Sequence, residues 1–311
     1  MKHTTILTIS AILLLAGFCM TGCEASVSNY QPKVEAVTDA KIEDMQLPYP
    51  TEASGEKKYK KKNAIVDYSN SSDGYVMAQY SGKCKNVKVI IEGPVDKYTY
   101  TIKDNNWNSF PLSQGNGEYR IGMYENVKGN KYAQLLTRSF KVELTDEFAP
   151  FLRSNNYVNY ESAPNTVATA AKLAEGLETP LDIVSEVFMY VVGTMTYDKE
   201  LAKTVESGYV PDLDYDLKIK KGICFDYASM MTGMLRSQGI PCKLVVGYAG
   251  GAYHAWISVW VEGEGWIENV IHFDGNEWYR LDPTFASTSG INGEFFQYIG
   301  DGRNYVEKYF Y

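Results

Sequence analysis

The stretch Lys220-Lys-Gly-Ile-Cys-Phe-Asp-Tyr-Ala228 decides how the second half of this chain folds. A glycine turn precedes a run that reads as a helix to about Gln238, so the stretch predicts a helix that opens at Cys224. Gly239 supplies a left-handed position after this helix, and Pro241 blocks its continuation. Cys224 therefore stands in the first helical turn, where unpaired backbone N–H groups and the helix dipole favour a thiolate.

Two further residues follow Cys224 at similar intervals, 30 residues to His254 and 28 more to Asp282. His254 lies in a predicted strand, and Asp282 ends a second one, which Pro283 stops. A thiol, a base and an orienting carboxylate on three adjacent elements suit nucleophilic acyl transfer. We therefore predict Cys224 as nucleophile, His254 as general base and Asp282 as the group that orients the imidazole.

Each of the three residues also has a purely structural interpretation. A lone cysteine is more often a small buried residue, a strand histidine a core residue, and an aspartate before proline a turn residue. The combination favours catalysis because each residue stands in a context that suits its role. Of the other two histidines, His3 lies in the N-terminal segment and His272 in a loop-like stretch, which leaves His254 as the base.

The elements around these residues predict an α+β domain over residues 146–311. Helical spacing of apolar residues covers Val167 to Leu177, and a second helix begins at Thr179-Pro-Leu-Asp182, with Thr179 as N-cap and Pro180 at the first helical position. Antiparallel strands are expected after the helix of Cys224, over Cys242–Tyr248, Tyr253–Glu262, Gly265–Glu268 and Trp278–Leu281.

Residues 63–145 show a different pattern, with short period-two runs separated by turn sequences such as Gly115-Asn-Gly117. This pattern predicts a small antiparallel β-sandwich of the immunoglobulin-like class. Seven strands are expected, at Ala64–Asp67, Tyr75–Tyr80, Val87–Ile91, Tyr98–Ile102, Trp107–Phe110, Tyr119–Tyr124 and Ala133–Leu144.

The N-terminus reads as a targeting segment. Residues 1–22 combine a short polar start with an apolar run from Ile6 to Phe18, which is too short to span a bilayer of about 30 Å. Cys23 follows Thr-Gly, a pattern similar to bacterial lipoprotein signals, and is the predicted lipidation site; an ordinary secretory signal is the alternative. Residues 23–62 are polar, lack periodicity and are predicted to be a flexible tether. We expect an extracytoplasmic protein that is anchored to the cell membrane by lipid.

The net charge of the 311-residue chain changes sign near residue 145, the predicted boundary between the two domains. Residues 55–145 carry 15 Lys and Arg against 9 Asp and Glu, whereas residues 146–311 carry 12 against 23. The acidic second half argues against a nucleic-acid partner. No paired Cys-x-x-Cys ligands suggest zinc, and we expect neither a metal nor another cofactor. Asp212, Asp214 and Asp216 occupy alternate positions of one short stretch, and such carboxylates could bind calcium. A solvated acidic loop is the favoured interpretation.

Taken together, the motifs resemble the transglutaminase-like superfamily, whose members have a papain-like core. The resemblance covers residues 165–286 and rests on Gly222–Ala228, Leu235–Cys242, Val246-Gly-Tyr248, His254-Ala-Trp256 and Trp278–Thr284, with Met195-Thr-Tyr-Asp198 upstream. It implies a Cys224, His254 and Asp282 triad and a thioester intermediate. It also makes Tyr197 and Gly222 candidates for the oxyanion site or the cleft.

The expected function is that of a cysteine enzyme that acts on amide bonds of proteins or cell-wall peptides. Hydrolysis, as in a peptidase or amidase, is favoured because water is always available. Two alternatives stay open: a transglutaminase that crosslinks proteins, and a non-catalytic binding scaffold on the cell surface. The sequence does not decide the substrate, the role of the sandwich or the oligomeric state.

Overall fold

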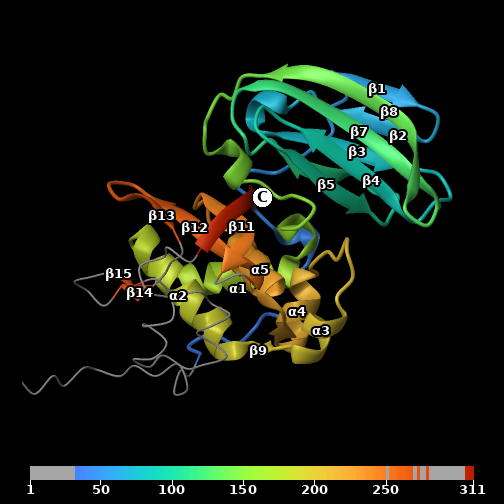
Figure 1. Cartoon of the computed structure of the whole chain (residues 1–311). Coiled ribbons are helices and arrows are strands. Elements are labelled where there is room, and N and C mark those ends of the chain that lie inside the picture. The colour runs from blue at the N-terminus through green and yellow to red at the C-terminus, as the bar shows by residue number, and fades with distance from the viewer. Residues whose placement is uncertain (1–31, 250–251, 269–271, 274–277, 280–304) are drawn as a thin grey trace, which may run out of the picture.

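The molecule consists of a sandwich of two β-sheets, drawn at the top of Figure 1, and a second half below it that contains both helices and a sheet. The computed structural model describes residues 32–249, 252–268, 272–273, 278–279 and 305–311. In these residues the strands of the first half precede the helices of the second, which confirms the predicted α+β core behind a β-sandwich. The boundaries placed at 62/63 and 145/146 stay predictions.

The sandwich consists of two four-stranded antiparallel sheets, ordered β1-β2-β3-β6 and β5-β4-β7-β8. All seven predicted strands are present, and β1 adds an eighth. Their bounds are β1 Lys58–Lys61, β2 Ala64–Asp67, β3 Tyr75–Tyr80, β4 Val87–Glu92, β5 Lys97–Ile102, β6 Asn108–Pro111, β7 Gly117–Lys128 and β8 Lys131–Val142. Alternate side chains of β4 and β5 are buried, as a two-sheet core requires.

A buried tyrosine closes the corner between β6 and β7, at the point where the chain changes sheets. The Tyr119 hydroxyl donates toward the carbonyls of Leu112, at 3.2 Å, and Gly115, at 2.9 Å, and it accepts from the Gln114 N–H at 3.2 Å. A tyrosine at this corner is typical of immunoglobulin-type sandwiches. The immunoglobulin-like class stays a prediction, which this corner supports.

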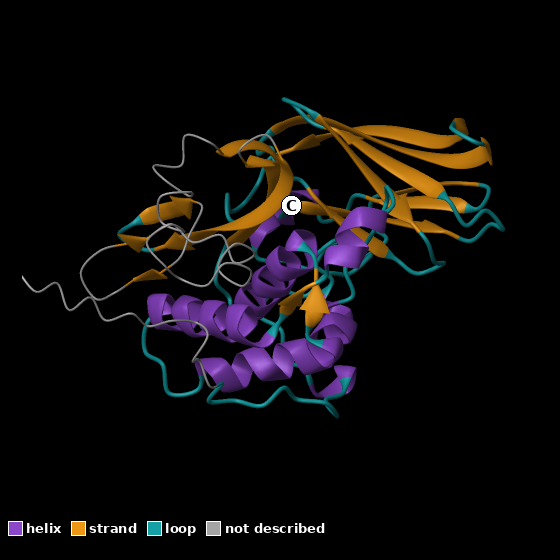
Figure 2. Cartoon of the chain, turned by 60° about the horizontal axis from the view of Figure 1, so that its bottom comes forward, coloured by secondary structure: helices purple, strands orange, loops and turns teal. Residues whose placement is uncertain are grey.

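The second half is built around one buried helix, α5 (Cys224–Ser237). Helices α1 (Pro164–Ala174), α2 (Pro180–Thr194) and α4 (Leu213–Ile219) pack on one side of it. Strands β11 (Cys242–Ala249) and β12 (Ala252–Val261) pack on the other, in a sheet ordered β13-β12-β11-β16. Figure 2 shows these helices gathered beneath the sheet. Because every α5 residue from 226 to 237 is buried, this helix is the core of the domain.

The remaining elements are short. Strands β13 (Gly265–Glu268) and β16 (Tyr305–Phe310) flank β11 and β12, and β14 (His272–Phe273) pairs with β15 (Trp278–Tyr279). Strands β9 (Thr196–Tyr197) and β10 (Lys221–Gly222) form a small parallel pair, and α3 is Lys199–Thr204. Single 3₁₀ turns occur at Ile42–Asp44, Ser71–Asp73, Ala149–Phe151 and Tyr160–Ser162. No helix among the described residues is long and apolar enough to cross a membrane.

The predicted helix ends are confirmed where local chemistry sets them. Thr179 caps α2 by accepting from the Asp182 N–H at 3.2 Å. Gly239 follows α5 with a φ of +77°, a conformation that glycine adopts without steric cost. Its N–H donates to the Arg236 carbonyl at 2.9 Å, and the Ile240 N–H donates to the Leu235 carbonyl at 3.1 Å. These bonds terminate the helix as the sequence indicated.

The structure differs from the predicted tether over residues 32–62. This segment is bonded to both halves: Thr51 donates its N–H and hydroxyl to the two Glu161 oxygens, at 2.6 and 2.7 Å, and the Gly55 N–H donates to Asp67 at 2.7 Å. Residues Lys58–Lys61 form β1 rather than a loose basic run. Backbone pairing and side-chain caps hold the segment, and neither leaves a signal in hydrophobic periodicity.

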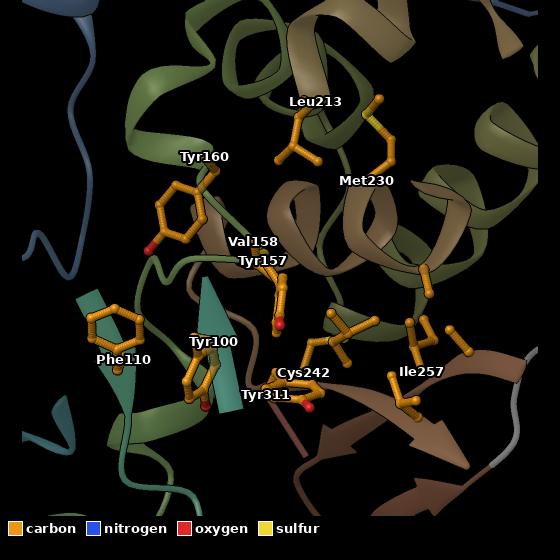
Figure 3. Close-up of a cluster of buried hydrophobic side chains, with 14 of the residues drawn as sticks. Tyr100, Phe110, Tyr157, Val158, Tyr160, Leu213, Met230, Cys242, Ile257 and Tyr311 are labelled. Carbon is orange, nitrogen blue, oxygen red and sulfur yellow. The ribbon is translucent and has the colours of Figure 1, made fainter. Parts of the chain in front are cut away.

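Tyrosines fill the contact between the two halves. Tyr100 from β5 lies 5.3 Å from Tyr157 and 5.7 Å from Tyr311, measured between ring centroids, and Tyr157 and Tyr311 are 4.9 Å apart. Figure 3 shows these three rings together, with Tyr160 and Val158 leading towards α5. Tyr157 also meets Phe225, the neighbour of Cys224, at 5.1 Å. The sandwich is thereby fixed against the start of α5.

A fully buried arginine joins separate parts of the fold. The Arg236 guanidinium donates to the carbonyls of Cys242 at 2.9 Å, Arg153 at 2.8 Å and Tyr311 at 2.5 Å. These carbonyls belong to the start of β11, the segment after the sandwich and the residue after β16. Burial lowers the Arg236 pKa to about 10, so the side chain still carries its charge at neutral pH.

We expect Arg236→Met to destabilise the protein by about 3–5 kcal/mol, because three buried carbonyls lose a charged donor. The free energy of unfolding, measured by urea denaturation, checks this. Arg138→Met is the matched control: Arg138 is exposed and donates to the Tyr68 hydroxyl, so its loss should cost about 1 kcal/mol or less. Equal losses in the two variants would contradict the joining role of Arg236.

Candidate active site

A cleft of about 560 Å³ opens between the sandwich and the helical half. Cys224 and His254 both line it, with Tyr197 beside them. Strand β5 supplies part of the opposite wall. The structure thus brings the predicted nucleophile, the predicted base and a predicted cleft residue to one cavity.

Cys224 is the first residue of α5, as predicted, and its thiol is free and half-buried. The turn before it is held by Asp226, whose Oδ2 accepts from the Ile223 N–H at 2.7 Å, which is one half of a capping box. A Cβ at Gly222 would lie 2.6 Å from the Asp226 Cβ, so only glycine fits there. Cys224 therefore lies in the first turn of a helix, where the leading backbone N–H groups lack the usual intrahelical partner, and it lines the cleft.

Tyr197 reaches the site through the short parallel pair β9 and β10. The Thr196 N–H donates to the Lys220 carbonyl at 2.9 Å, and the Asp198 N–H donates to the Gly222 carbonyl at 2.8 Å. Tyr197 is the register partner of Gly222, which lies two residues before Cys224. Lys220 takes a left-handed φ of +53° to turn the chain from α4 into this pair. Tyr197 thus lies in the cleft, and Gly222 forms its support.

His254 lies on β12 with its side chain buried to 9% exposure. Its register partner on β11 is Gly247, where a Cβ would collide with the Val306 backbone oxygen of β16. The imidazole lies 6.3 Å from the fully buried ring of Trp256, measured between centroids, in a stacked arrangement. His254 therefore reaches the cleft from a strand that is paired along its length with β11.

A buried acidic cluster lies behind the nucleophile helix. The Tyr209 hydroxyl, from the cleft loop, donates to Asp226 Oδ1 at 2.8 Å. Burial raises the pKa of Asp226 to about 6. Burial first, and then the nearby carboxyls of Asp226 and Asp212, raise the pKa of Asp216 to about 8. Among the described residues Asp216 Oδ2 has no hydrogen-bond partner, so the fold holds this group most easily when it is protonated.

Stability should therefore fall as the pH rises from about 4 to about 8. The unfolded chain releases the Asp216 proton near its ordinary value of 3.8, whereas the folded protein retains it up to about 8. Asp216→Asn cannot titrate, so we expect a smaller loss of stability over this range and a gain of at least about 1.4 kcal/mol at pH 8, which corresponds to one pKa unit. Urea denaturation at several pH values measures this.

The control for that series is Asp39→Asn, at an exposed position of the N-terminal segment. Its stability curve should run parallel to that of the unchanged protein. The interpretation fails if the Asp216→Asn curve also runs parallel.

The prediction of a solvated acidic loop at Asp212, Asp214 and Asp216 is wrong, because these residues begin and form helix α4. Asp212 is the N-cap of α4, and Asp214 accepts from the backbone and side chains of Asn165 and Thr166. Asp216 is buried, because α4 packs on α5. Within the described residues no group of three or more His, Cys, Asp or Glu side chains is arranged to hold a metal ion.

Other predicted site residues lie outside the described part. Asp282 and the lipidation site Cys23 are among these, so both assignments stay predictions. Conversely, sequence reasoning missed the cleft residues of β4 and β5 and those of the loop 205–209. Only a tertiary contact brings the sandwich to Cys224, and a single sequence carries no signal for it.

The geometry agrees with comparisons to known proteins. The family model described as "Transglutaminase-like superfamily" matches residues 167–283, a range that contains Cys224, His254 and Asp282. Over this range the chain is similar to the transglutaminase-like superfamily. The matched range includes most of α1, all of α2 and α5, and strand β12, which carries His254.

Two curated proteins are similar to this chain over part of their length. An uncharacterized protein, YebA, from Bacillus subtilis is 28% identical over 199 residues, which cover 56% of this chain and 26% of that protein. A protein-glutamine gamma-glutamyltransferase from Pseudomonas aeruginosa is 32% identical over 86 residues, which cover 23% of this chain and 11% of that protein. The chain thus spans about a quarter or less of these relatives.

Solved structures are similar at lower identity. A candidate cysteine protease from Cytophaga hutchinsonii has a TM-score of 0.38 at 13% identity, and the match covers 78% of this chain and 79% of that one. Red sea bream transglutaminase has a TM-score of 0.28 at 16% identity, with 69% and 48% covered.

Proposed function

We propose that this protein is a cysteine enzyme that cleaves amide bonds through a thioester on Cys224. One observation carries the proposal: Cys224 and His254 line the same cleft. Cys224 is the first residue of a buried helix, and His254 is a buried residue of a strand. The family match over residues 167–283 supports a cysteine enzyme of this kind.

The reaction follows from these positions. The Cys224 proton passes to His254, and the thiolate adds to the amide carbonyl carbon, whose π electrons move to oxygen. First-turn N–H groups of α5, with Tyr197 nearby, stabilise that oxyanion. When the carbonyl re-forms, the carbon–nitrogen bond breaks and the leaving amine takes the proton from His254. Water then adds to the thioester and gives a proton to His254. When this second intermediate collapses, the carbon–sulfur bond breaks, the Cys224 sulfur takes the proton back from His254, and a carboxylic acid is released. Asp282 orients the imidazole in this proposal.

Crosslinking is the second candidate, because the gamma-glutamyltransferase relative is 32% identical over 86 residues. In that reaction an amine, rather than water, attacks the thioester. The chemistry at Cys224 is the same up to that step, so only the acceptor distinguishes the two.

We further propose that the enzyme acts outside the cytoplasm. Residues 1–22 serve as the signal peptide, and a lipid on Cys23 anchors the mature chain to the membrane. The proposed substrate is a protein or a peptide, such as a cell-wall peptide, and not a nucleic acid. The acidic charge of residues 146–311 supports the last statement.

A product assay tests the proposed reaction. The full chain in detergent is incubated with cell-wall peptides and a dansylated amine, and the products are read by mass spectrometry. We expect amide hydrolysis, with loss of at least about a thousandfold in Cys224→Ala, because that variant lacks the nucleophile. Cys84→Ala, which removes a partly exposed thiol of the sandwich, should retain activity.

The outcomes separate the alternatives. Amine adducts that are absent from Cys224→Ala would support crosslinking instead of hydrolysis. Equal product in all three proteins, or none in any of them, would contradict catalysis at Cys224.

A further inference from the structure

The sandwich supplies one wall of the cleft that contains Cys224. Four of its residues line the cavity: Lys88 from β4 and Lys97, Thr99 and Thr101 from β5. In Figure 1, β5 lies on the side of the sandwich that faces the helices. A sandwich with a purely structural role would not need polar side chains on the wall that faces the nucleophile, so these side chains indicate a binding surface.

Strand β5 is an edge strand among the described residues, with β4 as its pairing partner. The turn into it is closed by a bond from the Gly93 N–H to the Asp96 carbonyl, at 3.0 Å. Because hydrogen-bonded pairs alternate in an antiparallel ladder, residues 98, 100 and 102 bond to β4, and the polar backbone groups of 97, 99 and 101 point away. The Tyr157 hydroxyl, which donates to the Thr99 carbonyl at 3.4 Å, confirms this direction.

The Lys97 N–H already donates to Asp96 Oδ1 at 2.6 Å and the Thr99 carbonyl accepts from Tyr157, so the edge presents the Thr99 N–H to another extended chain. Six residues of β5 span about 20 Å at about 3.4 Å per residue, which is long enough for a peptide of similar length. The loop 205–209 closes one end, since a Cβ at Gly208 would lie 2.8 Å from the Thr101 Oγ1. A peptide along this edge would lie within the cleft that Cys224 lines.

The charges on this wall are cationic. Lys97 and Thr99 are exposed, whereas Tyr98 and Tyr100, which alternate with them along β5, are buried. Lys88 is the register partner of Thr101, and its Nζ lies 4.6 Å from the ring centroid of Tyr132, which belongs to β8 on the other side of β4. Across the cleft, Glu206 is the acidic residue that lines the described cavity. Two lysines beside an open strand edge suit carboxylate side chains.

We propose that the edge of β5 binds an extended acidic peptide, whose backbone accepts a hydrogen bond from the Thr99 N–H and whose carboxylates meet Lys88 and Lys97. This proposal rests on the proposed amide chemistry, because it names the substrate that the edge presents to Cys224. It assigns the sandwich the role of selecting the substrate.

Charge reversal tests the lysines. Two synthetic extended peptides, each with one central glutamine, carry either two glutamates or two lysines beside it. We expect the unchanged full chain to favour the glutamate peptide by about tenfold or more in kcat/KM. In Lys88→Glu/Lys97→Glu the preference should invert. Lys58→Glu/Lys60→Glu makes the same charge change on β1, which belongs to the other sheet and is exposed, and should leave the preference unchanged.

A second pair of variants tests the backbone edge. Thr99→Pro removes one outward N–H, which an edge strand tolerates, whereas Thr99→Val removes only the hydroxyl. We expect proline to weaken binding of both peptides by about fivefold or more and valine to have little effect. Thermal denaturation shows whether each variant is folded, and the lysine variants decide the matter if proline unfolds the chain.

Binding is measured separately from turnover, by fluorescence anisotropy of labelled peptides on Cys224→Ala. If charge-selective binding occurs and no variant turns over peptide, the substrate edge stands and the proposed reaction fails. If the unchanged protein turns over peptide but Lys88→Glu/Lys97→Glu keeps its preference, the edge proposal is overturned and the reaction stands. If neither peptide binds, the edge proposal is also overturned.

Discussion

The burial of α5 is the constraint on which the rest of the structure depends. Helices cover one side of it and the sheet of β11 and β12 covers the other. Arg236 then ties its last turn to three separate backbone carbonyls. A buried guanidinium is stable only when such partners are complete, so the helix cannot rotate or slide without a large cost. Cys224 is placed at the open end of a rigid element, as a reactive group requires.

The same rigidity extends across the two halves through aromatic side chains. Tyr157 packs between Tyr100 and Tyr311 at the interface and contacts Phe225 beside the nucleophile. Large rings with few rotatable bonds bury much area for little loss of entropy. Tyr100, Tyr157 and Tyr311 thus help to hold the two walls of the cleft together.

Much of this arrangement could be predicted from the sequence, because local chemistry decides it. The start of α5 at Cys224, the Thr179 cap, the end at Gly239 and seven strands of the sandwich all depend on neighbouring residues. Motif context led us to expect Cys224 and His254 in one site, and both residues line the same cleft.

The failures share a physical cause, which is dependence on distant partners. The segment 32–62 has no hydrophobic period, yet Glu161 and Asp67 hold it through backbone donors. Asp216 looks like a solvated residue until the packing of α4 buries it. The wall formed by Lys88 and Lys97 becomes part of the site only when the sandwich docks.

The central claim is that His254 activates Cys224 across the cleft. The most direct measurement is the rate at which iodoacetamide alkylates Cys224 at neutral pH, read by peptide mass spectrometry, in the unchanged protein and in His254→Gln. Since only the thiolate attacks, we predict that alkylation of Cys224 is slower in His254→Gln by about tenfold or more. Cys84 in the same samples should be alkylated at the same rate in both proteins. Equal alkylation of Cys224 in the two proteins would contradict the claim.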